Sequence, residues 1–350
     1  MKSTEDDQGP ALKKPMFVTR KAISVAEEAL TTLVPLRADG RLPLVIEPRG
    51  EGLDLERWAG ANQDVLKRQL LSVGGILFRN FGLTSEAELE RFIQAVSGEP
   101  LEYTYRSTPR KRVAGKVYTS TEYPADQFIP LHNEMSYTRN WPMKICFLCL
   151  KASQEGGETP IADSRRVYER IDPSIRDRFA AKQVMYVRTY GSSVDLSWQE
   201  VFQTSDKSAV EAYCRTAGIE FTWIGERGLR TSQVCQAVVT HPVTGEVVWF
   251  NQAHLFHVSG LPPSVRDSLL SSYGEENLPR NAYYGDGTSI ELPVLDAIRE
   301  AYRQETITFP WREGDVLMLD NMLSAHGRTP FVGSRKVVVG MAEPYNLQGS

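Results

Sequence analysis

Residues 130–150 read Pro-Leu-His-Asn-Glu-Met-Ser-Tyr-Thr-Arg-Asn-Trp-Pro-Met-Lys-Ile-Cys-Phe-Leu-Cys-Leu, and their second half carries the strongest strand signal in the chain. Weaker β-type runs lie on both sides, and the sequence predicts further strands at residues 42–47, 76–81, 113–121, 127–132, 160–162, 306–309, 315–320 and 336–341. A Pro-Val-Thr-Gly turn between residues 234–240 and 247–251 indicates a hairpin. Helices are expected at residues 53–73, 85–96, 163–170, 263–273 and 294–304.

This order of elements predicts a mainly β fold with flanking helices. Short strands early and late in the chain, separated by a long mixed α/β insertion, suit a double-stranded β-helix, also called a jelly roll. A doubly wound nucleotide-binding fold is not indicated, because no Gly-x-Gly-x-x-Gly follows a strand. Residues 1–15 are polar and are expected to form a disordered tail, and residues 16–350 to form a single catalytic domain.

Composition and charge exclude several classes of function. The chain has 350 residues, 24% of them charged, and a formal net charge of -4. Nucleic acid is not an expected partner, because binding to phosphates usually requires a basic excess. No membrane segment is expected either, because no apolar run approaches the roughly 20 residues that a spanning helix needs. A cytoplasmic protein is the expectation.

The four cysteines do not indicate a disulfide framework. Cys146 and Cys149 form a Cys-x-x-Cys, but they lie in a strand pattern, where residues three apart point to opposite faces. We therefore expect buried thiols that fill the core and not a metal or redox pair. Unpaired cysteines fit a reducing compartment.

The stretch Leu131-His-Asn-Glu134 is the first chemical signal. On an extended segment His132 and Glu134 share a face and can present an imidazole and a carboxylate to one point. Because 44 acidic residues accompany five histidines, this spacing alone is weak support. His326, in Ser324-Ala-His-Gly327, is the candidate for a third ligand. Two histidines and one carboxylate leave three positions open on an octahedral ion, which is the pattern of iron(II) oxygenases.

Two further residues suit a dicarboxylate cosubstrate. Arg335 lies at the entry to an apolar strand after His326, and its planar guanidinium suits the distal carboxylate of 2-oxoglutarate. Thr159, in Glu155-Gly-Gly-Glu-Thr-Pro160, can donate its hydroxyl to the same carboxylate. Either residue alone is more typical of an ordinary surface or loop position. The prediction of a 2-oxoglutarate site depends on their occurring together with the metal-binding pattern.

Five longer stretches together resemble one enzyme family. They are Pro130-Leu-His-Asn-Glu-Met-Ser-Tyr137, Gly156-Gly-Glu-Thr-Pro-Ile-Ala-Asp-Ser164, Ser197-Trp-Gln-Glu-Val-Phe202, Val248-Trp-Phe-Asn-Gln252 and Asp320-Asn-Met-Leu-Ser-Ala-His-Gly-Arg-Thr-Pro330. With them the sequence resembles the TauD/TfdA-type iron(II)/2-oxoglutarate dioxygenases, in their clavaminate synthase-like branch and most of all its SyrP-type members. The resemblance implies a jelly-roll core and dioxygen as the oxidant. It also implies iron ligation by His132, Glu134 and His326, and 2-oxoglutarate binding by Thr159 and Arg335.

The resemblance further implies hydroxylation of an unactivated C–H bond in natural-product biosynthesis. The expected substrate is a small molecule, an amino acid or its derivative, either free or tethered to a peptidyl carrier protein. Desaturation or cyclisation of another intermediate remains open. A substrate carboxylate requires a second cation, and the candidates are Arg328, Arg188 and Arg106. Trp198 and Phe202 are candidates for a lid over the pocket, with a place in the core as the alternative.

Two other classes of protein have to be considered. A zinc or manganese hydrolase or isomerase on a cupin-like barrel uses the same three ligands, but it has no need of Thr159 and Arg335. A cupin-like binding protein with a structural metal is the second alternative. It is disfavoured because both the ligand set and the pair of residues for 2-oxoglutarate are present.

Overall fold

The computed structural model describes residues 30–38, 42–102, 112–119, 123–191 and 195–347, so the predicted tail at residues 1–15 and the candidate Arg106 lie outside the described part. The strands are β1 Thr31–Pro35, β2 Leu44–Pro48, β3 Gly75–Phe78, β4 Arg112–Ala114, β5 Val117–Thr119, β6 Ile129–His132, β7 Asn140–Lys151, β8 Glu155–Gly156, β9 Ile161–Asp163, β10 Val184–Tyr190, β11 Glu220–Ile224, β12 Gly228–Cys235, β13 Val238–Thr240, β14 Val247–Trp249, β15 Arg280–Tyr284, β16 Val316–Asp320, β17 Ser324–Arg328, β18 Phe331–Val332 and β19 Lys336–Asn346. The helices are α1 Leu55–Ala61, α2 Gln63–Val73, α3 Glu86–Ser97, α4 Ser164–Arg170, α5 Pro173–Lys182, α6 Trp198–Phe202, α7 Lys207–Ala217, α8 Ala253–Phe256, α9 Pro263–Tyr273 and α10 Leu292–Glu305, with 3-10 turns η2 Val258–Gly260 and η3 Glu275–Asn277.

Two sheets form the catalytic part of the fold. The larger has eight strands in the order β1-β2-β3-β16-β7-β19-β5-β4, and the smaller has three in the order β6-β17-β9. The long strands β7 and β19 pair antiparallel in the middle of the larger sheet. This arrangement agrees with the predicted mainly β fold with flanking helices.

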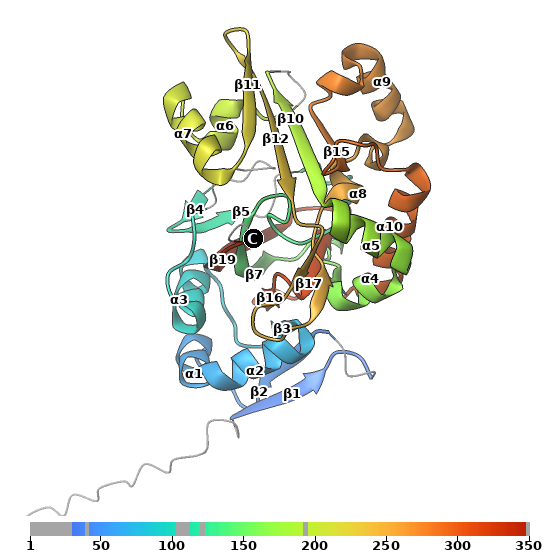
Figure 1. The fold of residues 1–350 in the computed structure, drawn as a ribbon. Coiled ribbons are helices and arrows are strands. Elements are labelled where there is room, and N and C mark those ends of the chain that lie inside the picture. Colours follow the sequence, from blue (N-terminus) through green and yellow to red (C-terminus); the bar gives the residue numbers. More distant parts are fainter. Residues whose placement is uncertain (1–29, 39–41, 103–111, 120–122, 192–194, 348–350) are drawn as a thin grey trace, which may run out of the picture.

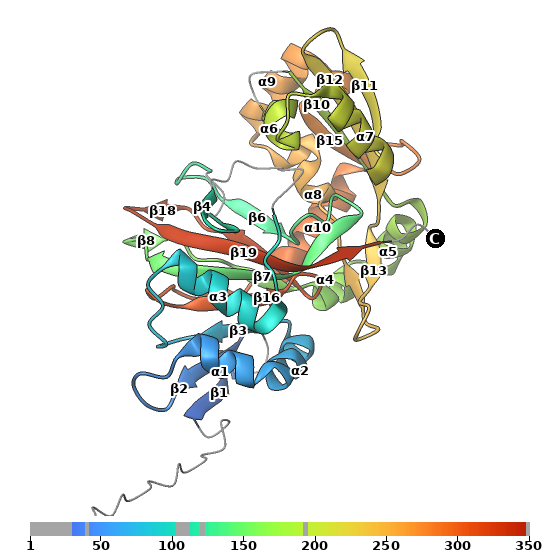
Figure 2. The ribbon, with the colours of Figure 1, turned by 90° about the vertical axis from the view of Figure 1, so that its left-hand side faces the viewer.

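The side chains of β7 alternate between two cores, as the pleat of a strand requires. Ile145, Phe147 and Cys149 lie in a core that also contains Ile161 of β9, in the smaller sheet. Cys146, like Leu148, lies on the opposite face, in a core with residues of α1, α2 and α3. Figure 2 shows α1 and α3 against this outer face of the larger sheet. The two cysteines of the Cys-x-x-Cys therefore face opposite ways, as predicted.

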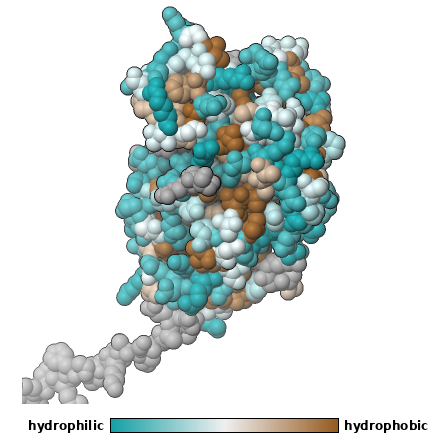
Figure 3. All heavy atoms as spheres, in the orientation of Figure 1, coloured by the Kyte–Doolittle hydropathy of each residue, from teal (hydrophilic) through white to brown (hydrophobic). Residues whose placement is uncertain are grey.

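A long insertion follows β9 and precedes β16. It contains a four-stranded antiparallel sheet, in the order β11-β12-β10-β15, together with helices from α4 to α10. An apolar core packs its elements together and against the smaller sheet, through Leu131, Ala162 and Ala325. Figures 1 and 2 show its four-stranded sheet standing above the catalytic sheets, with α8 between them. On the face drawn in Figure 3, apolar residues gather at the middle, and hydrophilic residues predominate around them.

The structure corrects three local predictions. The helix expected at residues 53–73 is broken at Asn62, whose side-chain amide donates to Trp58 O and ends α1. The strand expected at residues 113–121 is the hairpin β4–β5, because the chain turns at Gly115 with φ of 44°. The run at residues 306–309 forms only a single bridge, between Ile307 and Ile161. Among the described residues, no helix is long and apolar enough to span a membrane.

Burial makes the thiols of this fold unreactive. All four cysteines are buried and unpaired, and desolvation raises the pKa of both Cys146 and Cys149 to about 12 and that of Cys214 to about 11. A raised pKa lowers the thiolate fraction at any given pH, and the thiolate is the reactive species. We expect no thiol to react with a disulfide reagent in the folded protein near pH 8, and four to react after unfolding. Rapid labelling of the native protein would contradict this expectation.

Candidate active site

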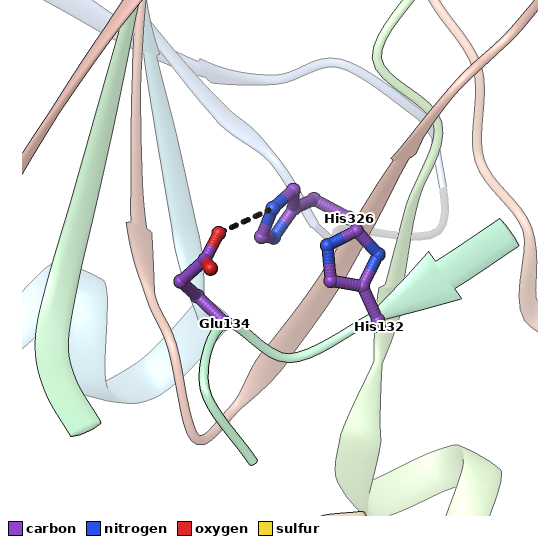
Figure 4. A group of neighbouring side chains, drawn as sticks. All are labelled: His132, Glu134 and His326. Carbon is purple, nitrogen blue, oxygen red and sulfur yellow. Dashed lines mark ion pairs between the residues drawn. The ribbon is translucent and has the colours of Figure 1, made fainter. Parts of the chain in front are cut away.

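The pairing of β6 with β17 brings the two candidate histidines together. His132 lies directly opposite His326 in this antiparallel pair, with ring centroids 4.6 Å apart. Glu134 follows the end of β6, and its Oε2 lies 3.9 Å from Nε2 of His326. One ligand atom from each of the three residues lies within 4.8 Å of the others, and Figure 4 shows the side chains converging. One ion can therefore contact all three.

The chemistry of these donors fits iron(II). His132 Nδ1 lies 2.8 Å from Pro130 O, so this nitrogen donates its proton to the carbonyl and Nε2 is left as the ligand atom. Glu134 and His326 are buried, which excludes bulk water from two of the three ligands. Two neutral imidazoles and a carboxylate form the facial set that leaves positions for a chelating cosubstrate and dioxygen.

Asn321 fixes the backbone of the carboxylate ligand. Its Oδ1 accepts from Glu134 N at 2.7 Å, and its Nδ2 donates to Glu134 O and Pro142 O, both at 2.9 Å. In return, Asn133 Nδ2 donates to Asn321 O at 2.7 Å. Met135, the next residue, has φ of 57°, a conformation that is uncommon for a side chain of this size. The turn between β16 and β17 thus determines where the Glu134 carboxylate lies.

Replacing Asn321 by Leu is expected to weaken both the fold and the metal site. The change leaves the N–H and C=O of Glu134 buried without partners, at a cost of about 3 kcal/mol in the free energy of unfolding. It should also weaken iron(II) binding about 10- to 100-fold. Urea unfolding and metal titration measure the two effects. Asn277→Leu is the control, because Asn277 is exposed and donates only to Tyr273 O. Equal effects of the two variants would contradict the role of Asn321 in positioning Glu134.

The candidate 2-oxoglutarate residues lie where β8 and β18 pair. Arg335 Nε donates to Gly157 O at 2.7 Å, and its guanidinium lies 5.7 Å from the ring of Phe331. Burial, more than any other factor, lowers the pKa of Arg335 to about 10, so the group is still charged near neutral pH. Thr159 is buried, and its hydroxyl accepts from Trp311 Nε1 at 3.1 Å. Their contact with the cosubstrate stays a prediction.

Gly157 allows the Arg335 side chain to lie close to the backbone. Its φ is 72°, in the region that glycine adopts readily. A Cβ at this position would lie 3.0 Å from Arg335 Cδ and 3.1 Å from Phe331 Cβ. The close approach of the backbone to Arg335 therefore requires a residue without a side chain at position 157.

The three substrate candidates differ in their surroundings. Arg328 is buried, and its guanidinium donates to the carbonyls of Tyr123, Pro124 and Gln127, so it holds that loop in place. Arg188 is buried in β10 on the same face as Tyr186, with its guanidinium 4.9 Å from the ring centroid of Tyr190. Arg106 lies outside the described residues, and the role of all three in substrate binding stays a prediction.

The two lid candidates pack inside the insertion. Trp198 is buried, with its ring 5.2 Å from that of Trp223, and its Nε1 donates to Arg227 O. Phe202 contacts the rings of Tyr190 and Tyr213. These contacts support the core alternative for both residues.

The comparisons with known proteins agree with this site. The family model described as "Taurine catabolism dioxygenase TauD, TfdA family" matches residues 37–341. Dapdiamide synthesis protein DdaC of Enterobacter agglomerans is 44% identical over 77% of this chain and 82% of its own length. A clavaminate synthase-like protein of Arabidopsis thaliana is 30% identical, with the same coverage of 77% and 82%.

A solved structure with a similar fold is that of PvcB, described as an iron- and α-ketoglutarate-dependent oxygenase from an isonitrile synthetic pathway. It superposes with a TM-score of 0.54 at 16% identity and covers 91% of this chain and 94% of its own. A second PvcB structure, from Pseudomonas aeruginosa, covers 89% of this chain and 90% of its own, with a TM-score of 0.52 at 17% identity.

Proposed function

The chain belongs to the TauD/TfdA family of dioxygenases, and on that premise we propose that it hydroxylates an unactivated C–H bond of an amino acid or an amino-acid-derived natural-product intermediate. It is an Fe(II)/2-oxoglutarate-dependent dioxygenase, and family membership selects this class over a zinc or manganese hydrolase or isomerase. The observation that carries the proposal is the convergence of His132, Glu134 and His326 within 4.8 Å.

The side chains of the protein would bind iron and 2-oxoglutarate and orient them. When bound, iron would activate dioxygen, the oxidant; 2-oxoglutarate would supply two electrons as it is converted to succinate and carbon dioxide, and the C–H bond of the substrate would supply the other two. His132, Glu134 and His326 would hold the ion and leave one side of it open. Thr159 and Arg335 would bind the distal carboxylate of 2-oxoglutarate and so fix its orientation. The buried surroundings of the site keep bulk water away from the reaction.

The proposed substrate class is supported by the relatives. The 44% identical relative is named as a dapdiamide synthesis protein, and the family resemblance points to amino-acid chemistry. We propose that Arg188 binds the substrate's carboxylate. Arg188 lies on the same face of β10 as Tyr186, whose hydroxyl accepts from Gln252 N. The side chain of Gln252 in turn donates to Asn133 O, between the candidate ligands His132 and Glu134. Delivery of the substrate on a peptidyl carrier protein belongs to the same proposal. So does a cytoplasmic location, which the four unpaired cysteines support.

The test proceeds in two steps. Iron(II) and then 2-oxoglutarate are added to the metal-free protein without oxygen, and a weak visible absorption band is expected only when both are present. Free amino acids and carrier-tethered aminoacyl groups are then screened for oxygen-dependent release of succinate. A product heavier by one oxygen atom supports hydroxylation, whereas the loss of two hydrogen atoms supports desaturation or cyclisation. Bound iron without the band would contradict the assignment of 2-oxoglutarate.

A further inference from the structure

Two of the three candidate ligands belong to one edge of the smaller sheet: His132 ends β6, and Glu134 lies in the turn that follows it. In the order β6-β17-β9, β6 has a neighbouring strand on one side only among the described residues. Residues 131 and 133 precede the two ligands, so their backbone carbonyl groups belong to the peptide units that lead into His132 and Glu134. Buried carbonyl groups require hydrogen-bond donors. The partners of these two carbonyls therefore help to determine where His132 and Glu134 lie.

Two side chains of the insertion donate to these carbonyls, and Asn133 O also accepts from Ser136 N at 3.3 Å and Ser136 Oγ at 3.0 Å within its own turn. His254 Nε2 lies 3.0 Å from Leu131 O, and Gln252 Nε2 donates to Asn133 O at 2.8 Å. Both donors are buried, with exposed fractions of 4% and 3%. The two side chains therefore tie the insertion to the backbone of the segment that carries His132 and Glu134.

Both donors are anchored in the insertion. The backbone N–H of Gln252 donates to the hydroxyl of Tyr186 at 2.7 Å, which ties it to β10. The His254 ring lies 4.6 Å from that of Tyr302 in α10, and His254 O accepts from Arg299. Burial lowers the pKa of His254 to about 3, so the ring is neutral near pH 7 and its Nε2–H donates to Leu131 O.

We propose that Gln252 and His254 are positioning residues for the metal centre, through which the insertion determines the geometry of the ligand strand. The inference rests on the proposed iron site. Neither residue belongs to the three candidate ligands, and each donates to the carbonyl group of the residue that precedes a ligand. A shift of α8 relative to the smaller sheet would move His132 and Glu134 together, because both donors lie on one short segment.

His257 provides a matched control on the same segment. It has the same side chain as His254 and lies three residues further on, but its Nδ1 contacts only Ser259 of its own segment. His254→Phe keeps an aromatic ring against Tyr302 and removes the donor. His254→Gln restores an amide donor of similar reach, and Gln252→Leu removes the other donor at nearly constant volume.

Iron(II) affinity, measured by anaerobic calorimetry on the full-length metal-free protein, separates positioning from folding. His254→Phe is expected to weaken iron(II) binding about 10- to 100-fold. Gln252→Leu should weaken it less, because Asn133 O keeps its donors from Ser136. His254→Gln should recover most of the affinity, and His257→Phe should bind iron(II) as the wild type does. The thermal midpoint of each metal-free variant shows how much of an effect comes from the fold.

Two results would overturn the proposal. One is unchanged iron(II) affinity in both His254→Phe and Gln252→Leu. The other is a loss of affinity in His257→Phe equal to that in His254→Phe, since this would indicate a general effect on the insertion. Failure of the proposed function gives a different result, because wild-type protein would then bind iron(II) but show no absorption band with 2-oxoglutarate.

Discussion

Replacing Glu134 by Ala is expected to abolish turnover, with kcat/KM lowered at least about a thousandfold, or about 4 kcal/mol of transition-state stabilisation. Glu134 provides the only carboxylate of the three-residue metal site, and its side chain is buried beside His326. Without it, two neutral imidazoles hold a divalent ion with no anionic partner. Succinate release in the presence of substrate measures the loss, and calorimetry measures iron(II) affinity.

Two further variants make this experiment specific. Glu134→Asp keeps the charge but withdraws the carboxylate by one methylene, so partial activity is expected. Glu226→Ala removes an exposed glutamate in the turn between β11 and β12 and should leave activity unchanged. Full activity in Glu134→Ala would show that the ion is bound elsewhere.

Replacing Arg335 by Ala is expected to raise the KM for 2-oxoglutarate at least about thirtyfold, which corresponds to about 2 kcal/mol or more for a buried charged partner. Iron(II) affinity should stay the same, because Arg335 lies on the segment between β18 and β19 and not in the ligand set. Arg335→Lys keeps the charge but loses the two-pronged geometry, so an intermediate KM is expected. Steady-state kinetics with 2-oxoglutarate as the varied substrate give these values.

The neighbouring Lys336 is the matched control. Its side chain is half exposed and pairs with Glu86 at the surface, an interaction that contributes little to stability. Lys336→Ala should leave the KM for 2-oxoglutarate unchanged. A normal KM in Arg335→Ala would remove Arg335 from the cosubstrate site and make Arg328 the next arginine to test.

Local patterns explain why much of the fold could be predicted from the sequence. The alternation of side chains along β7 depends only on the pleat of a strand, so the opposite faces of Cys146 and Cys149 were predictable. The same period of two predicted that His132 and Glu134 share a face; in the structure Glu134 lies in the turn after β6, and its carboxylate still comes within 4.8 Å of a His132 ligand atom. The broken helix at Asn62 was missed because a single side-chain hydrogen bond to Trp58 O ends it, and the apolar pattern continues past that point.

The roles of the arginines were harder to predict. Arg328 was chosen because it lies two residues from His326, but the pairing of β17 with β6 is irregular between these two residues. Its guanidinium donates to the carbonyls of Tyr123, Pro124 and Gln127, about 200 residues earlier in the chain, and its role in substrate binding stays a prediction. Proximity in sequence does not determine what a long, flexible side chain contacts.

The sequence by itself determined the fold class and predicted the candidate metal ligands, because residue spacing and the family motifs can be recognised in short stretches of chain. Only the tertiary structure showed what holds those ligands in place. Asn321 reaches the Glu134 backbone across 187 residues of sequence, and Gln252 and His254 reach Asn133 O and Leu131 O across 119 and 123 residues. Contacts between residues so far apart in sequence arise when separate elements pack together, and the periodicity of a short stretch of sequence does not predict them.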